Sequence, residues 1–81
     1  MAYVYLLRCA DDSLYCGWTT DPERRLRQHN AGTASRYTKR RLPVEYALLV
    51  PAQDRAAALR EEARIKKLAR TEKLALIAAS R

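Results

Sequence analysis

The chain contains no phenylalanine and is poor in the residue types that build metal centres and covalent cross-links. Its 81 residues include one histidine and only two cysteines, Cys9 and Cys16. Two scattered cysteines and one histidine lack the spacing of a zinc site, and two cysteines do not make a disulfide framework. A reducing, cytoplasmic environment is therefore expected.

Long apolar runs are also missing. The apolar segment at the start, Ala2 to Leu7, is too short to span a bilayer or to act as the hydrophobic core of a secretory signal. The basic segments carry no long apolar face of the kind that binds a membrane surface. No membrane partner is expected.

Acidic residues are absent from positions 24 to 41, although the chain as a whole has a formal net charge of +7. The cations in this stretch are Arg24, Arg25, Arg27, Arg36, Lys39, Arg40 and Arg41. Ordinary solvated surfaces intersperse the two signs, so an unrelieved basic stretch indicates a polyanionic partner such as nucleic acid. The alternative is a basic face that serves solubility alone.

What is present indicates a folded module. The hydrophobic content is 48%, and 81 residues suffice for one small domain spanning 1–81. A core of this size leaves room for a shallow groove and not for a deep enclosed pocket.

The first half of the chain predicts a β-hairpin followed by a helix. Strands are expected at Ala2–Cys9 and Leu14–Thr19, joined by a tight turn over Ala10–Ser13. Asp21, Pro22 and Glu23 together are typical of a helix start, and Gly32 offers a left-handed cap after a helix end near Asn30. Thr33–Leu42 is expected to be a polar, basic loop.

The second half predicts a third strand and two helices. Pro43–Val50 is expected to be a strand closed by Pro51, a helix should run from Gln53 or Asp54 to about Ala69, and a short helix should cover Glu72–Ala79. The expected fold class is α/β of the α+β kind: a small three-stranded sheet flanked by helices, in the order ββαβαα.

The tyrosines cluster on the predicted hairpin. If the turn leaves Ala10, Asp11 and Asp12 unpaired, Tyr5 opposes Gly17 and lies diagonally across the same face from Tyr15. A four-residue loop would put the two tyrosines on opposite faces unless a bulge intervenes. Gly17 would then leave open space beside the Tyr5 ring, compatible with a ligand approaching the backbone. The plainer alternative is an aromatic cross-strand cluster.

A series of short motifs along nearly the whole chain indicates the function more specifically than the charge and the tyrosines do. Tyr3-Val4-Tyr5 is followed by Tyr15-Cys16-Gly17, within the pattern YxGxTxDxxRRLxxHN, and later by ExxIKKLxRxEKLxLI from Glu62. This combination resembles the GIY-YIG nuclease domain, and in particular its small stand-alone bacterial members.

The resemblance implies hydrolysis of phosphodiester bonds in nucleic acid, with DNA favoured as the partner, assisted by one Mg²⁺ or Mn²⁺ ion. Tyr5 and Tyr15 would flank the attacking water, with Tyr5 as the preferred general base. Arg25 would contact the phosphate, and His29 could assist proton transfer. Glu62 would be the sole protein ligand of the metal. Nucleic-acid contacts are assigned to Arg24, Arg27, Arg36, Tyr37, Lys39, Arg40 and Arg41.

The residues themselves leave alternatives open. Glu62 falls on the same helical stripe as Ala58, Leu59 and Ile65, yet an ion pair with Lys66 would also account for it. Arg25 and His29 share a helix face that could simply be solvated. Tyr37 could stack on a base or pack against the sheet.

Tyrosine needs a lowered pKa to act as a base. A free phenol has a pKa near ~10. A charge such as that of Arg25 a few ångströms away would lower this pKa toward neutrality. Alternatively, Tyr5 only orients the water.

The sequence departs from the family pattern in having Tyr3-Val4 and Cys16 in its motifs, and in having no asparagine besides Asn30. The competing interpretation is a non-catalytic nucleic-acid-binding module that keeps the nuclease fold. A third is an accessory subunit that holds an acidic protein. With so short a chain, target choice in DNA repair or processing would come from the basic loop, a homodimer or a partner protein.

Overall fold

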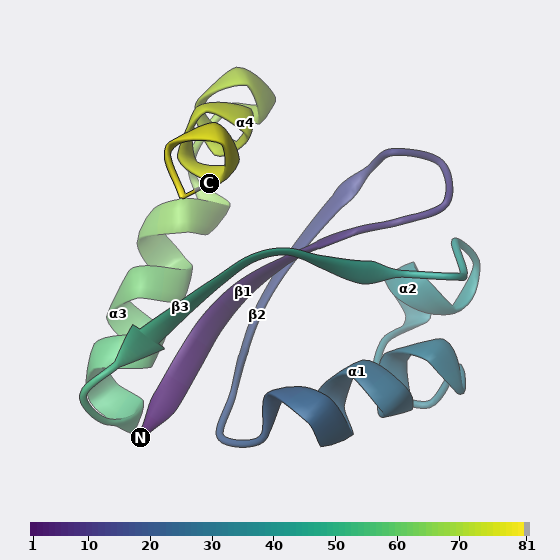
Figure 1. Cartoon of the computed structure of the whole chain (residues 1–81), viewed down its shortest axis with the longest axis horizontal. Coiled ribbons are helices and arrows are strands. Elements are labelled where there is room, and N and C mark those ends of the chain that lie inside the picture. The colour runs from purple at the N-terminus through teal and green to yellow at the C-terminus, as the bar shows by residue number, and fades with distance from the viewer. Residues whose placement is uncertain (81) are drawn as a thin grey trace.

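A three-stranded antiparallel sheet separates two helical layers (Figure 1). The computed structural model describes residues 1–80. The strands are β1 (Ala2–Arg8), β2 (Leu14–Thr19) and β3 (Glu45–Ala52), in the spatial order β2-β1-β3. The helices are α1 (Pro22–Asn30), α2 (Arg36–Lys39), α3 (Arg55–Lys66) and α4 (Arg70–Ala79).

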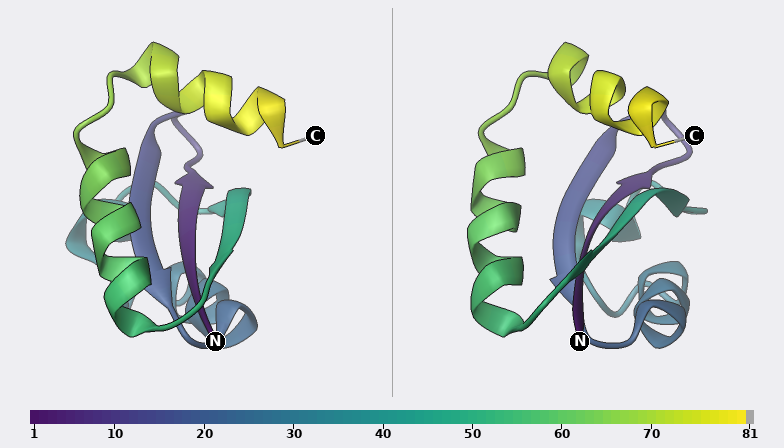
Figure 2. Two further views of the ribbon diagram at one scale, coloured as in Figure 1. Left: turned by 90° about the vertical axis from the view of Figure 1, so that its left-hand side faces the viewer. Right: turned by 60° about the vertical axis from the view of Figure 1, so that its left-hand side comes forward.

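The predicted order ββαβαα and the α+β class are confirmed, with one addition. The stretch expected to be an irregular loop contains the single-turn helix α2. Ser35 starts this helix, since its side chain accepts a hydrogen bond from Tyr37 N at 3.1 Å. Figure 2 shows α3 and α4 on one side of the sheet and α1 and α2 on the other.

The hairpin register is the one expected from a three-residue turn. Tyr5 pairs with Gly17 and Leu7 with Tyr15. Cys9 N donates to Ser13 O at 2.9 Å, and Asp12 adopts a left-handed conformation with φ 65°. Because paired residues point to the same face, these tyrosines all lie on the side of α1 and α2.

Two apolar clusters hold the layers together. One lies between the sheet and α3 and α4, and it includes Val4, Leu6, Ala58, Ile65 and Ile77. The other lies on the side of α1 and α2, and its buried members are Tyr5, Leu7, Cys9 and Val44. Both cysteines are buried and free.

The predicted termini of three elements were wrong. β3 extends through Pro51, which is tolerated because β3 is an edge strand that needs no amide hydrogen there. α3 ends at Lys66 and not near Ala69. α4 begins at Arg70, because the Glu72 carboxylate accepts a hydrogen bond from Ala69 N at 3.0 Å and so caps the helix earlier than expected.

The starts of α1 and α3 agree with the prediction because each has an aspartate cap. The side chain of Asp21 accepts a hydrogen bond from Arg24 N at 3.1 Å, and that of Asp54 accepts one from Ala57 N at 2.8 Å. Gly32 has φ 80°, as expected for a left-handed residue after α1. Within residues 1–80, no helix has the length and apolar character needed to cross a membrane.

Candidate active site

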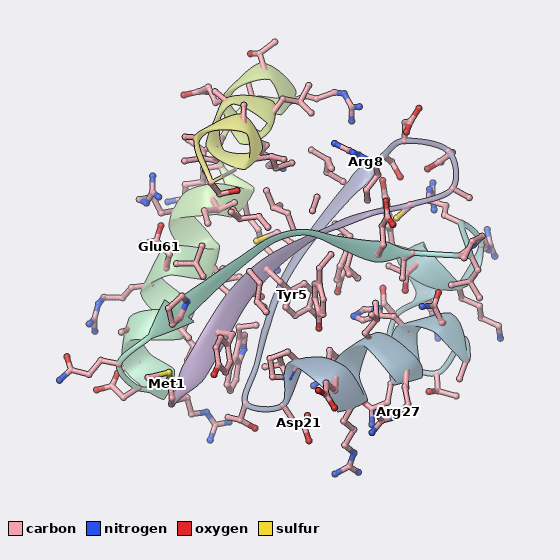
Figure 3. All side chains as sticks on the ribbon, viewed as in Figure 1. Met1, Tyr5, Arg8, Asp21, Arg27 and Glu61 are labelled. Carbon is pink, nitrogen blue, oxygen red and sulfur yellow. The ribbon has the colours of Figure 1, made fainter. Side chains whose placement is uncertain are left out.

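Tyr5 lies at the centre of a cluster between the sheet and α1 (Figure 3). Its side chain is 3% exposed, and its ring covers Gly17 on the neighbouring strand. A Cβ atom added at Gly17 would lie 2.5 Å from Tyr5 Oη and 2.6 Å from Tyr5 Cζ. The expectation of open space beside the ring was therefore wrong, because the Tyr5 phenol itself fills it.

His29 connects Tyr5 to α2. Its Nε2 lies 2.9 Å from Tyr5 Oη, and its Nδ1 lies 2.8 Å from Thr38 Oγ1. His29 is only 1% exposed, so it does not belong to a solvated basic face. The Tyr15 ring packs edge-on against the imidazole at 5.5 Å between ring centroids. One histidine thus contacts both motif tyrosines.

Burial sets the protonation states of this pair. Desolvation raises the pKa of the Tyr5 phenol well above its ordinary value, and the Arg25 charge offsets only part of that rise. Desolvation and, secondarily, Arg25 lower the pKa of His29. At pH 7 both groups are neutral. The expectation that a nearby cation would bring the tyrosine pKa toward neutrality was wrong for the protein alone, because burial outweighs the attraction.

Arg25 is a cation without an anionic partner among the described residues. Its Nε atom is buried and makes no hydrogen bond within residues 1–80, and none of the ion pairs of that part of the chain includes it. Next to it is a polar cavity of about 230 Å³. The cavity is lined by Thr19, Thr20, Asp21, Arg24, Arg25 and Gln28. An unsatisfied guanidinium beside a polar cavity is suited to bind an anion such as phosphate.

Glu62 is on α3, on the other side of the sheet from the Tyr5 ring. Its side chain is 17% exposed and forms an ion pair with Lys66 at 3.6 Å. Its carbonyl oxygen lies 3.9 Å from Cys16 Sγ on β2. Glu62 makes no hydrogen bond to either motif tyrosine within the described chain, although its negative charge contributes slightly to the raised pKa of Tyr5.

The helical stripe predicted to carry Glu62 is only partly buried. Ala58 and Ile65 are in the core, whereas Leu59 is 44% exposed. Glu61 pairs with Arg64 and, together with Leu48 and Val50 of β3, lines a shallow cavity. Glu62 therefore sits at the margin of the α3 interface, where its carboxylate is partly desolvated.

The donor set for a metal is small. Residues 1–80 contain no group of three or more His, Cys, Asp or Glu side chains placed to hold a metal ion. Glu62 offers the two oxygens of one carboxylate, whose ion-pair partner within residues 1–80 is the half-exposed Lys66. This fits a magnesium-type ion, which keeps several waters and takes one or two carboxylates together with phosphate oxygens.

The residues assigned to nucleic-acid contacts fall into two groups. Arg24, Arg27, Arg36, Lys39 and Arg40 are exposed on α1 and at α2. Arg41 is engaged within the protein, since it pairs with Asp11 at 3.1 Å and lies over the Tyr37 ring at 3.9 Å. Tyr37 also stacks on Tyr15, with 5.7 Å between ring centroids.

Two further residues of the cluster were not anticipated. Tyr46 packs edge-on against Tyr5 at 5.3 Å, and its hydroxyl donates to Pro22 O at 2.7 Å. Burial raises its pKa. Thr38 is fully buried and contacts His29. A register shift between Leu6 and Leu7 brings Tyr46 to this face, so side-chain alternation alone does not predict it. Nothing in the sequence distinguishes Thr38 from the polar residues around it.

One side of the sheet, covered by α1 and α2, thus holds two tyrosines, a histidine and an arginine whose Nε has no hydrogen-bond partner within residues 1–80. The model of the GIY-YIG catalytic domain matches residues 1–75, and the chain belongs to this family.

Among small relatives, the chain is similar to a UPF0213 protein of Syntrophus aciditrophicus, 47% identical over 76 residues that make up 93% of this chain and 87% of the relative. A UPF0213 protein of Haloquadratum walsbyi is 48% identical over 88% of this chain and 80% of its own length. The solution NMR structure of a UPF0213 protein of Bacillus halodurans superimposes with a TM-score of 0.63 at 36% identity, covering 98% of this chain and 85% of that one.

Proposed function

We propose that the protein is a metal-dependent endonuclease that hydrolyses phosphodiester bonds, with DNA as the first candidate substrate and DNA repair or processing as its setting. The observation that carries the proposal is the buried Nε of Arg25, which has no hydrogen-bond partner within the described residues. The charge of Arg25 acts on the pKa values of both Tyr5 and His29, which are hydrogen-bonded to each other. A phosphate bound by Arg25 would therefore be close to groups that can accept a proton from water. Membership in the GIY-YIG family supports the same reaction class.

Proton transfer through Tyr5 and His29 is consistent with the raised pKa of the phenol. The attacking water gives a proton to Tyr5 Oη while the proton of Tyr5 passes to His29 Nε2, 2.9 Å away. The tyrosine therefore acts as a base without existing as a free phenolate, whose formation burial disfavours. Arg25 stabilises the negative charge that develops on the phosphate.

Glu62 is the residue proposed to hold Mg²⁺ or Mn²⁺, with water and phosphate oxygens completing the shell. Such an ion would neutralise charge on the phosphate and acidify a bound water. The exposed cations of α1 and α2 (Arg24, Arg27, Arg36, Lys39 and Arg40) would contact the sugar-phosphate backbone.

Cleavage of supercoiled plasmid, with Mg²⁺ or Mn²⁺ and with chelator, tests the proposal. Glu62→Gln and Arg25→Ala are each expected to lower the rate by about 10²–10³-fold. Glu61→Gln, one position away and paired with Arg64 on the helix surface, should retain the wild-type rate. Equal cleavage by the wild type, Glu62→Gln and Arg25→Ala would refute the assignment.

The second candidate is a nucleic-acid-binding module without catalysis. The pairing of Glu62 with Lys66 favours it, because the carboxylate already has a cationic partner. This candidate requires salt-sensitive binding of DNA and no cleavage with any divalent ion by the wild-type protein. The same plasmid experiment therefore separates the two candidates.

A further inference from the structure

The single-turn helix α2 touches both ring systems of the candidate site. Tyr37 stacks on Tyr15, and Thr38, the next residue, reaches Nδ1 of His29. Thr38 is 0% exposed although it belongs to the basic stretch of the chain. A buried threonine between exposed cations has a task other than solubility.

The hydrogen-bonding partners of this cluster define which nitrogen of His29 carries the proton. With the proton on Nδ1, the Tyr5 hydroxyl donates to Nε2, Nδ1 donates to Thr38 Oγ1, and the Thr38 hydroxyl donates to Ser35 O at 3.4 Å. Every polar hydrogen of these three side chains then has an acceptor.

The opposite tautomer leaves a group unsatisfied. With the proton on Nε2, that nitrogen donates to Tyr5 Oη, and the Tyr5 hydrogen has no acceptor within residues 1–80. Tyr5 is 3% and His29 1% exposed, so little water can reach this hydroxyl. The water that reacts there donates its hydrogen to Tyr5 Oη, so it does not also accept the Tyr5 hydrogen. An unmade hydrogen bond at a buried hydroxyl is disfavoured, so the packing selects the Nδ1–H form.

We propose that Thr38 is a positioning residue that fixes His29 as the Nδ1–H tautomer, with the lone pair of Nε2 directed at the Tyr5 hydroxyl. The catalytic consequence rests on the proposed nuclease function. As the water oxygen bonds to phosphorus and the ester P–O bond breaks, the water O–H bond breaks and its proton joins Tyr5 Oη. The Tyr5 O–H bond breaks at the same time, that proton bonds to Nε2, and the leaving oxygen takes a proton from solvent. A His29 ring with its proton on Nε2 cannot accept that proton.

The tautomer can be read directly, because His29 is the only histidine in the chain. Two-bond ¹H–¹⁵N correlation spectra of the imidazole at pH 7.5 distinguish a protonated from an unprotonated nitrogen. The wild type should show a proton on Nδ1 and none on Nε2. Thr38→Val, which keeps the shape and removes the hydroxyl, should shift the proton wholly or partly to Nε2, and Thr38→Ser should restore the wild-type spectrum.

A wild-type spectrum with the proton on Nε2 overturns the proposal, and this result needs no variant to fold. A Thr38→Val spectrum identical to that of the wild type overturns it as well. On plasmid DNA, Thr38→Val should lower kcat at least about tenfold with little change in KM, and Thr38→Ser should recover most of the rate. If the wild type cleaves nothing, the proposed function fails, while the spectra still decide the tautomer.

Discussion

Substituting Gly17 by alanine should disrupt the candidate active site through a single added methyl group. The methyl carbon would lie 2.6 Å from Tyr5 Cζ, whereas non-bonded carbon atoms are ordinarily about 3.5 Å apart. Either the phenol ring or strand β2 must therefore move by about 1 Å. The Tyr5 ring is enclosed by His29 and Tyr46, at 5.8 and 5.3 Å between ring centroids, so it has no vacant space to enter.

Two quantities should change. Overpacking of this kind costs about 1–3 kcal/mol of the free energy of unfolding. With a urea m-value of ~1 kcal/mol/M for so small a domain, the midpoint of unfolding should fall by about 1–3 M. The ring displacement should also break the 2.9 Å hydrogen bond between Tyr5 and His29, and the ¹⁵N signals of His29 should shift. Cleavage, where the wild type cleaves, should fall with them.

Gly32→Ala provides a control that destabilises by another route. A Cβ there meets only Lys39 Cγ, at an ordinary 3.5 Å, but the residue has φ 80°, so the cost of about 1–2 kcal/mol is in the backbone. Adding Tyr5→Phe to Gly17→Ala should not restore stability, because Cζ remains. Wild-type unfolding and unchanged His29 signals in Gly17→Ala would refute this account of the motif glycine.

Two further predictions concern pH and salt. His29 has a lowered pKa in the folded state and an ordinary one near ~6.5 when unfolded, so the free energy of unfolding should fall as pH drops below about 6.5. The slope, at most about 1.4 kcal/mol per pH unit, should be absent between pH 7 and 5.5 in His29→Gln when urea unfolding is repeated across that range. For nucleic acid, the double variant Lys39→Gln, Arg40→Gln should reduce the slope of log affinity against log salt by about 0.9 for each phosphate that the variant no longer neutralises. The control is the double variant Arg60→Gln, Lys67→Gln, which makes the same charge change on α3 and directly after it. Measured by fluorescence anisotropy, its salt slope should stay near that of the wild type.

The hairpin and its tyrosines were predictable because the side-chain alternation of a strand is strict. Once Ala10 to Asp12 were left unpaired, the pairing of Tyr5 with Gly17 followed, and the structure has it. The starts of α1 and α3 were predictable for a similar reason, since Asp21 and Asp54 are capping residues whose role is local. Local chemistry thus determined much of the fold.

Residues that depend on distant packing were not predictable. Tyr46 reaches the Tyr5 face after a register shift between Leu6 and Leu7, where β3 gains an extra residue. The burial of His29 depends on α2, a helix of one turn that the sequence does not predict. The pKa of Tyr5 was misjudged for the same reason: a charge such as Arg25 can be counted from the sequence, whereas desolvation requires the packed structure.

The proposed site is divided by the edge of the sheet. Tyr5, His29 and Thr38 form their hydrogen-bonded chain on the side of α1 and α2, whereas Glu62 is on α3, next to Cys16 of β2. A packed sheet admits no ligand through its face, so an ion held by Glu62 and a phosphate held by Arg25 can meet only around a free edge. The strand order β2-β1-β3 leaves β2 and β3 as edges. β2 is the edge that lies beside both residues, because Glu62 contacts Cys16 and Arg25 shares a cavity with Thr19. β2 also holds Gly17, and the absence of a side chain there leaves the space that the Tyr5 hydroxyl occupies next to this strand. The proposed proton-accepting chain and the proposed metal ligand are therefore supported by different helices. Glu62→Gln should remove cleavage without disturbing the His29 spectrum.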